Sequence, residues 1–225
     1  MPRLSFFIVV TVALLRSTVV RKQRDQSEGV RHIWCRGNRK QPIFVDDFDR
    51  ERYLVLLTKV CRKTGWRVVA YCLMTNHVHL VIDVPADTLS YGMQLLSGEY
   101  AQAFNRRYGH VGHLFQGRFA ASRVDEEGYG LQVSRYVVQN PTRAGMVEEP
   151  VDWQWSSHQA VLGKVAPPPF LDVEWTLSQF ARKRDVARQA YADFVAAYWH
   201  RPERRGQAPG QDPGRRGPSG PARGP

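Results

Sequence analysis

The stretch TNHVHLVIDV, residues 75–84, alternates polar and apolar side chains. Alternation with a period of two is typical of a β-strand, because successive side chains of a strand point to opposite faces of the sheet. Val78, Leu80 and Ile82 are therefore predicted to face a core, and His77 and His79 to face outward together. This predicts a strand over 77–84 that carries two imidazoles side by side on one face.

The flanking segments switch between strand and helix periodicity in a regular order. Capping residues support the boundaries: Asp46 and Asp47 precede the first helix, Gly65 ends it, Asp125 is placed to cap the last one, and Asn140-Pro141 stops it. The order predicts an α+β fold of the ferredoxin-like split βαβ type, an antiparallel sheet with helices on one face and the other face free for a ligand. The predicted strands cover 30–35, 66–73, 77–84 and 114–124, and the predicted helices cover 49–64, 90–108 and 126–139.

The remaining segments divide the 225-residue chain into four parts. Residues 1–28 form an atypical leader whose apolar run, Leu4 to Leu15, is shorter than the roughly 20 residues that a membrane span needs, and a misassigned start is the favoured explanation. Residues 29–150 form the main domain, and 151–200 are expected to form a helical annex with helices over 172–181 and 184–199. The tail, 201–225, is rich in Pro, Gly and Arg and is predicted to be disordered.

The net charge of +11 invites a nucleic-acid partner, but its distribution weakens that inference. Residues 1–28 hold five basic and two acidic side chains, and 201–225 hold six Arg and two acids, so the central 29–200 carries only +4 of the total. Cys35, Cys61 and Cys72 form no CxxC pair, which favours reduced thiols and a cytoplasmic location. No membrane partner is expected, and a DNA partner would make that location nucleoid-associated.

Two groups of residues carry candidate chemistry. His77 and His79 can share a divalent metal ion, although a bare His-x-His pair is more often solvated. On the predicted helix 126–139, Tyr136 shares a face with Gln132 and with Asn140, four residues later. A tyrosine beside a metal-polarised phosphate can act as a covalent nucleophile, and the Asn140 amide oxygen suits a hard cation. Tyr129, two helical turns earlier, is the competing nucleophile.

Four blocks of sequence resemble the REP-associated tyrosine transposases, relatives of the bacterial single-strand insertion-sequence transposases that carry an HUH motif. The resemblance extends over about residues 29–165 and also covers WQWSS at 153–157. The four blocks are RGNRKQPIF at 36–44, YCLMTNHVHL at 71–80, GHLFQGRF at 112–119 and RYVVQNPTRAG at 135–145.

The resemblance implies a metal-dependent enzyme that nicks and rejoins single-stranded DNA, often beside a REP-like hairpin. The tyrosine of such enzymes becomes linked to the 5′ phosphate and leaves a free 3′ hydroxyl. Carried over by position, Tyr136 is the nucleophile, while His77, His79 and Asn140 hold Mg²⁺ or Mn²⁺. Members of the family occur as monomers and as homodimers, and both states stay open here.

Five polar residues are candidates for DNA binding. Arg36, Arg39 and Lys40 flank a turn and can grip a DNA backbone, although a solvated basic loop is an equal alternative. Gln116 and Arg118 lie in the predicted strand 114–124, where a phosphate or base contact competes with a surface ion pair.

Three alternatives to the transposase interpretation remain at this level. The first is a non-catalytic nucleic-acid-binding module. The second is a nuclease that uses water, with Tyr136 only structural. The third is a degraded transposase copy, because the leader is atypical and Arg31-His32 interrupts the first strand, which is taken as an edge strand.

Overall fold

The computed structural model describes residues 25–124 and 129–197. Most of the predicted leader, the Asp125 cap, the last residues of the annex and the tail lie outside the described residues. Among the helices of the described part, none combines the length and the apolar character needed to cross a membrane.

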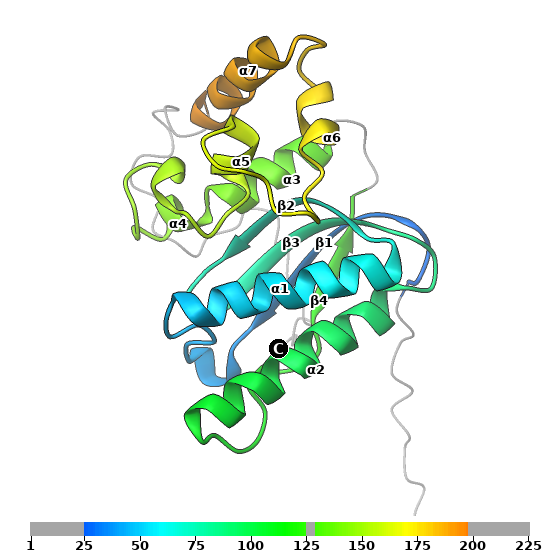
Figure 1. The fold of residues 1–225 in the computed structure, drawn as a ribbon, viewed down its shortest axis with the longest axis vertical. Coiled ribbons are helices and arrows are strands. Elements are labelled where there is room, and N and C mark those ends of the chain that lie inside the picture. Colours follow the sequence, from blue (N-terminus) through cyan, green and yellow to red (C-terminus); the bar gives the residue numbers. More distant parts are fainter. Residues whose placement is uncertain (1–24, 125–128, 198–225) are drawn as a thin grey trace, which may run out of the picture.

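The centre of the molecule is a four-stranded antiparallel sheet in the order β2-β3-β1-β4. Its strands are β1 (Gly29–Arg36), β2 (Arg67–Leu73), β3 (His77–Val84) and β4 (Ala120–Arg123). Helices α1 (Asp47–Thr64) and α2 (Leu89–Tyr108) lie across one face of the sheet, the side nearer the viewer in Figure 1. This arrangement confirms the predicted α+β, ferredoxin-like fold.

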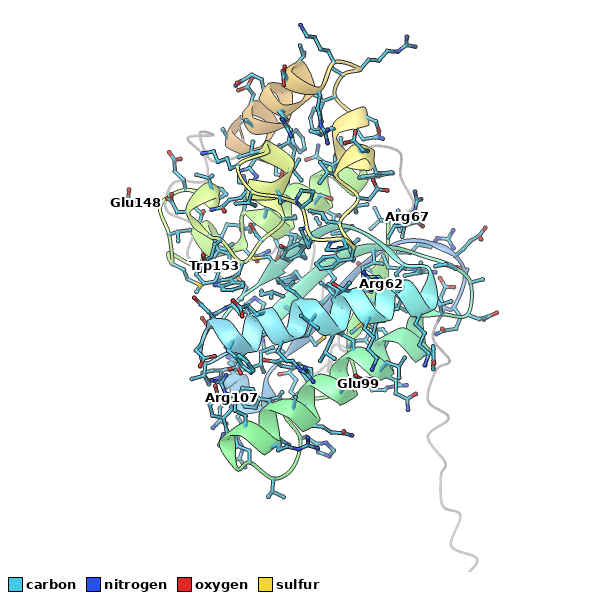
Figure 2. All side chains as sticks on the ribbon, viewed as in Figure 1. Arg62, Arg67, Glu99, Arg107, Glu148 and Trp153 are labelled. Carbon is cyan, nitrogen blue, oxygen red and sulfur yellow. The ribbon has the colours of Figure 1, made fainter. Side chains whose placement is uncertain are left out.

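Local signals set the ends of the two long helices. The side chain of Asp46 accepts a hydrogen bond from the Asp49 backbone N–H, 3.1 Å away, and so caps α1. Gly65 ends that helix with φ 74°, a left-handed conformation that glycine adopts without a steric penalty. Arg107, at the end of α2, binds the carboxylates of Asp46 and Asp49 at 2.6 and 2.7 Å and so ties the two helices together (Figure 2).

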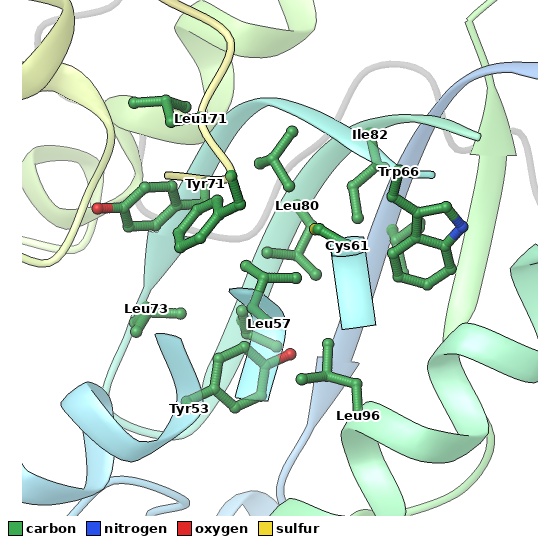
Figure 3. Close-up of a cluster of buried hydrophobic side chains, with 14 of the residues drawn as sticks. Tyr53, Leu57, Cys61, Trp66, Tyr71, Leu73, Leu80, Ile82, Leu96 and Leu171 are labelled. Atoms are coloured by element: carbon green, nitrogen blue, oxygen red, sulfur yellow. The ribbon is translucent and has the colours of Figure 1, made fainter. Parts of the chain in front are cut away.

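The main core lies between the sheet and helices α1 and α2. Leu57 of α1, Leu96 of α2 and Leu80 of β3 are fully buried there (Figure 3). The three cysteines are free and buried, as expected for small apolar side chains, and burial raises the pKa of the Cys35 and Cys61 thiols to about 12. The inward half of the β3 alternation is thus confirmed, because Val78, Leu80 and Ile82 all belong to this core.

The extra helix α3 (Tyr129–Val138) packs on the opposite face of the sheet. Its Val133 and Val137 form a second buried cluster with Val81 of β3 and Cys72 of β2. Strands β1 and β4 lie beyond this contact, and their outward side chains Trp34, Arg36 and Ser122 are exposed. The second face of the sheet is therefore partly covered, since Val30 of β1 also packs against the α3 cluster, and among the described residues an open strip of β1 and β4 remains around Trp34, Arg36 and Ser122.

Two expectations about the strands need correction. The predicted strand 114–124 is regular only over β4, and the segment before β4 is joined by an isolated Gly37–Phe115 bridge to the residue that follows β1. The first strand is an interior strand, paired with β3 on one side and β4 on the other. Arg31 does not interrupt it, because its buried guanidinium binds Asp25 at 2.8 Å and the Ser27 carbonyl at 2.8 Å.

The region after α3 is helical, as expected, but in shorter pieces. The helix ends at Val138, before the predicted Asn140-Pro141 stop, and a single turn then follows from Asn140. The first annex helix, α6, is shorter than the predicted 172–181, whereas α7 follows the predicted 184–199 up to residue 197, the last one that the structure describes. The short elements are η1 (Asn38–Lys40), α4 (Asn140–Arg143), η2 (Pro150–Asp152), α5 (His158–Leu162), α6 (Val173–Ser178) and α7 (Arg184–Ala197).

The annex closes the free edge of β2 and holds α3. Backbone bonds join Leu73 N to Trp155 O at 2.9 Å and Asp172 N to Val68 O at 2.8 Å, so the exposed edge of the sheet is paired. On the other side, the Gln139 side chain donates to the Val195 carbonyl of α7 at 2.6 Å. The annex therefore contacts both the sheet and the segment that follows Tyr136.

Two glycines of α2 test the packing of the main core. A Cβ at Gly92 would lie 2.2 Å from the Trp66 ring, which is held in place by a 2.9 Å hydrogen bond from its Nε1 to the Thr88 hydroxyl. We expect Gly92→Ala to destabilise the protein by about 1–3 kcal/mol through overpacking, measured by urea unfolding. Gly98→Ala, in the same helix with open space around it, should stabilise the protein by about 0.5–1 kcal/mol. Equal effects of the two substitutions would contradict this packing.

A buried histidine in the annex makes stability depend on pH. His158 is 5% exposed, and its Nδ1 lies 3.0 Å from the Tyr191 hydroxyl. Burial lowers its pKa from 6.5 to about 4, so the unfolded chain takes up a proton first and stability falls as pH decreases from 6.5 to 4.

The replacement His158→Gln removes this titration. The parent should lose about 3 kcal/mol more than the variant over that pH range, as measured by denaturant unfolding at a series of pH values. Parallel curves for the two proteins would show that His158 does not titrate as described.

Candidate active site

His77 and His79 lie together on the sheet face that α3 partly covers. Their ring centroids are 5.1 Å apart, and the rings are nearly perpendicular. His79 is only 7% exposed, because it points toward the edge of α3. The strand thus places both imidazoles on the face opposite to the core, as the alternation predicts, but in a recess at the side of a helix.

The hydrogen bonds of Asn76 define the protonation of His77. The Asn76 Nδ2 donates to the Lys40 carbonyl at 2.8 Å, so its Oδ1 is the atom that faces the Nδ1 of His77 at 2.7 Å. An amide oxygen only accepts hydrogen bonds, so the Nδ1 of His77 carries the proton. The Nε2 of His77 is then left with a lone pair, the form of imidazole that binds a metal ion.

A third histidine, His32 of β1, joins the pair. Its Nε2 lies 3.0 Å from the Nδ1 of His79, and the two rings stack with centroids 5.2 Å apart. Burial lowers the pKa of His32 and His77 to about 4 and that of His79 well below 6.5, so all three rings are neutral at pH 7. In a neutral pair one ring donates and the other accepts, and a donor Nδ1 on His79 leaves its Nε2 free as well.

Tyr136 lies beside the histidines with its ring partly open to solvent. The ring centroid is 5.9 Å from that of His79 and 6.0 Å from that of His32, both edge-on. The residue is 37% exposed, whereas Val133 and Val137 on the buried side of the same helix anchor α3 to the sheet. Tyr129, the competitor, is the first residue of α3, two turns from Tyr136.

Arg143 of α4 adds a positive charge at the tyrosine. Its guanidinium carbon lies 4.8 Å from the centre of the Tyr136 ring. An arginine in this position interacts favourably with the ring face and also suits a phosphate that approaches the tyrosine.

Asn140 is anchored next to Tyr136 through its amide nitrogen. The Nδ2 donates to the carbonyls of Tyr136 at 2.9 Å and Val137 at 3.3 Å. Neither bond uses the side-chain oxygen, which is the atom that a hard cation prefers. Gln132, the other polar residue predicted for this face, instead accepts a hydrogen bond from Arg135.

No group of three or more His, Cys, Asp or Glu within residues 25–124 and 129–197 is arranged to hold a metal ion. A metal ion at this site would therefore need the two histidine nitrogens together with oxygen ligands from other groups. The free Nε2 of His77 and the unused oxygen of Asn140 have the required donor chemistry for Mg²⁺ or Mn²⁺.

Four of the five predicted DNA-binding residues lie together in space, and Arg118 lies apart from them. The turn that carries Arg36, Arg39 and Lys40 joins two other segments, with Gly37 N bonded to Asn76 O at 2.8 Å and Gln116 N to Arg36 O at 3.0 Å. Arg36 is also close enough for its charge to lower further the pKa values of His77 and His79, which burial already depresses. Arg118 is exposed, and within the described part of the chain no backbone hydrogen bond of this kind joins it to the site.

The backbone of the basic turn is strained. Arg39 and Lys40 have φ values of 53° and 61°, in the left-handed region that residues other than glycine rarely adopt. The bond from Asn76 to the Lys40 carbonyl helps to hold the turn, so the basic turn and the His77 ring share one support. Strain of this kind is often concentrated at functional sites.

Four residues at or next to this site were not singled out from the sequence: His32, Asn76, Arg143 and Trp34, whose ring centroid lies 5.1 Å from that of His32. A signal for two of them was present, because Val30, His32, Trp34 and Arg36 alternate with the buried Arg31, Ile33 and Cys35. Applied to this first strand, the period-two rule would place His32 on the same face as the His77 and His79 pair.

Comparison with known proteins was made for both the sequence and the fold. A family model described as "Transposase IS200 like" matches residues 26–140, just over half of the chain. A protein of Haemophilus influenzae described as a REP-associated tyrosine transposase is 23% identical over 121 residues, which cover 48% of this chain and 69% of that protein.

Two solved structures are similar. A REP-associated tyrosine transposase bound to a REP hairpin matches with a TM-score of 0.53 and 16% identity, over 68% of this chain and 88% of that chain. A transposase of Deinococcus radiodurans is 19% identical and covers 49% of this chain and 88% of its own, but its TM-score of 0.38 does not establish a shared fold. The family model, the Haemophilus influenzae protein and the structure bound to a REP hairpin together confirm the resemblance to REP-associated tyrosine transposases that the sequence motifs predict.

Proposed function

Because the chain belongs to the IS200-like transposase family, we propose that it cleaves and rejoins single-stranded DNA with Tyr136 as the nucleophile. The observation that carries this proposal is the position of the Tyr136 ring, 5.9 Å from His79 and edge-on to it. A tyrosine that is only structural has no need of a place beside a recessed histidine pair. The arginine over its ring also favours an anionic substrate at this point.

The reaction that fits these groups is an exchange of ester bonds at one phosphate. The Tyr136 hydroxyl oxygen forms a bond to phosphorus, and the bond from phosphorus to the 3′ oxygen breaks. The phenol loses its proton and the departing 3′ oxygen gains one, which leaves a 5′-phosphotyrosine and a free 3′ hydroxyl. Attack by a 3′ hydroxyl on the phosphotyrosine reverses these steps and rejoins a strand.

His77, His79 and Asn140 are the proposed ligands of a divalent metal ion, Mg²⁺ or Mn²⁺. When bound, such an ion supplies charge neutralisation and polarisation of the scissile phosphate. Asn76 orients the His77 ring through its Oδ1, and His32 orients the His79 ring through its Nε2. These two residues act as positioning residues, because ligand rings need a partner on the second nitrogen to fix their tautomer.

The DNA partner follows from the basic residues around the site. Arg36 at the end of β1 and Arg39 and Lys40 on the strained turn that follows are all exposed. Gln116 lies next to Arg36 in space, so a DNA backbone bound there would pass beside the histidine pair. Arg118 is proposed to extend this contact from the same loop segment. The REP hairpin in the similar solved structure supports hairpin-containing DNA as the substrate class.

The nucleophile is tested with labelled single-stranded hairpin DNA from around the gene of this chain, Mn²⁺ and a denaturing protein gel. We expect a covalent protein–DNA adduct with the parent and with Tyr129→Phe, but none with Tyr136→Phe, because only the Tyr136 hydroxyl is replaced. DNA binding by Tyr136→Phe should remain, since the ring beneath Arg143 is kept. Cleavage without an adduct would instead favour a nuclease that uses water, and binding without cleavage would favour a non-catalytic module or a degraded copy.

The role of His32 is tested by Mn²⁺ titration calorimetry without DNA. His32→Ala should weaken Mn²⁺ binding about 10- to 100-fold, the usual cost of removing the partner of a ligand histidine. His32→Gln, which keeps a hydrogen-bonding amide near the Nδ1 of His79, should recover part of that loss. His110→Ala, which removes a histidine beside Phe104 at the end of α2, serves as the control. Unchanged Mn²⁺ affinity in His32→Ala would contradict the positioning role.

A further inference from the structure

The strip of the sheet that α3 leaves open carries an exposed aromatic ring next to the candidate active site. Trp34 of β1 is 37% exposed and shares its face of the strand with His32 and Arg36. In the sheet it lies between His79 of β3 and Ala120 of β4. This strip is on the side of the sheet away from α1 and α2, behind it in Figure 1.

From this placement we propose that Trp34 is a stacking platform for an unpaired base of the single-stranded DNA that enters the active site. The proposal deepens the proposed function and rests on it. In this proposal the strip binds the base of a nucleotide close to the scissile phosphate, and the basic turn contacts the DNA backbone. Neither the family match nor the similar structures assign a role to this residue.

The aromatic side chains between Trp34 and the nucleophile form a short row. The Trp34 and His32 rings have centroids 5.1 Å apart with an interplanar angle of 33°, and His32 is 6.0 Å from Tyr136. Trp34 is therefore separated from the attacking residue by one imidazole ring. A base stacked on the indole belongs to a nucleotide near the one whose phosphate Tyr136 attacks.

The neighbours of Trp34 leave the indole accessible. Its partner in β4 is Ala120, and the next outward position of that strand is Ser122, opposite His32. Both side chains are too small to cover an indole ring. The α3 cluster covers β2, β3 and the Val30 end of β1, and within the described residues the strip beside Trp34 stays open, with Trp34 37% exposed.

The charges around the strip favour a nucleic acid over an apolar partner. Arg36 follows Trp34 on the same face, and Arg39 and Lys40 follow on the adjoining turn, all three exposed. One aromatic ring bordered by cations is the usual composition of a site for single strands, where bases stack on aromatic rings and cations track the backbone. A protein interface of useful size requires a wider apolar patch, and apart from Val30, which packs against the α3 cluster, the other outward residues of β1 and β4 are small or polar.

The test measures binding separately from cleavage. All variants are made in the Tyr136→Phe protein, and the probe is a fluorescein-labelled hairpin with an unpaired extension, taken from the DNA around the gene. Trp34→Ala should raise the Kd about 5- to 150-fold, the range expected for the loss of one stacked base. Trp34→Phe should recover much of the affinity, because it keeps an aromatic face. Tyr91→Ala, which removes an exposed aromatic residue of α2, should leave the Kd unchanged.

A second measurement identifies the base itself. Abasic sites are introduced one at a time into the unpaired extension, and each probe is titrated with the parent and with Trp34→Ala. We expect one position at which the abasic site weakens binding by the Tyr136→Phe parent but has no further effect in the Trp34→Ala variant. Such non-additivity is the signature of a direct contact. Additive losses at every position, or a Trp34→Phe variant as weak as Trp34→Ala, would overturn the proposal.

The two proposals fail separately. If Tyr136 forms no adduct but the coupling between Trp34 and one base is found, the platform stands and the proposed chemistry is wrong. If the adduct forms and no base couples to Trp34, the chemistry stands and the platform is wrong. Thermal unfolding of each variant, compared with the Tyr136→Phe parent, separates loss of stacking from loss of fold.

Discussion

The contact between α3 and the sheet is the constraint on which the candidate site depends. Val133 and Val137 are buried against Val81 and Cys72, and this packing fixes both the height and the rotation of the helix. Tyr136 is adjacent to Val137 but exposed, so the same contact that buries the valines turns the tyrosine toward His79. The apolar packing of α3 thus determines the geometry of the candidate site, and the polar side chains do not themselves fix the position of the helix.

The order of the elements and much of the site could be predicted from the sequence, because both depend on local periodicity. The alternation from His77 to Val84 predicted the face of each side chain, and the spacing from Tyr136 to Asn140 predicted their proximity, although α3 ends at Val138 and Asn140 begins a separate helix. The interior position of β1 could not be predicted, because pairing order depends on contacts between distant segments. The polar Arg31 argued against an interior strand until its buried partners, Asp25 and Ser27, were known.

His32 and Arg143 illustrate a second limit. Each is ordinary in its local sequence, and each acquires significance only through a neighbour far along the chain or on the next helix. The role of Asn76 depends on a carbonyl 36 residues earlier, since the bond to Lys40 decides which end of the amide faces His77. Hydrogen-bond networks of this kind are invisible to spacing rules, whereas apolar periodicity is not.

The annex contains none of the proposed catalytic groups, yet it contacts the helix that carries the proposed nucleophile. The Gln139 side chain donates a hydrogen bond to the carbonyl of Val195, and the guanidinium of Arg135 lies 4.3 Å from the centre of the Phe194 ring. Helix α7 therefore contacts residues on both sides of Tyr136 in the sequence. The position of the tyrosine is consequently coupled to the folding of a distant segment of the chain. In a population of molecules, the fraction able to react cannot exceed the fraction in which the annex is folded. Substitutions in the annex, far from the DNA, would therefore lower the active fraction of the protein and leave the chemistry of each active molecule unaltered.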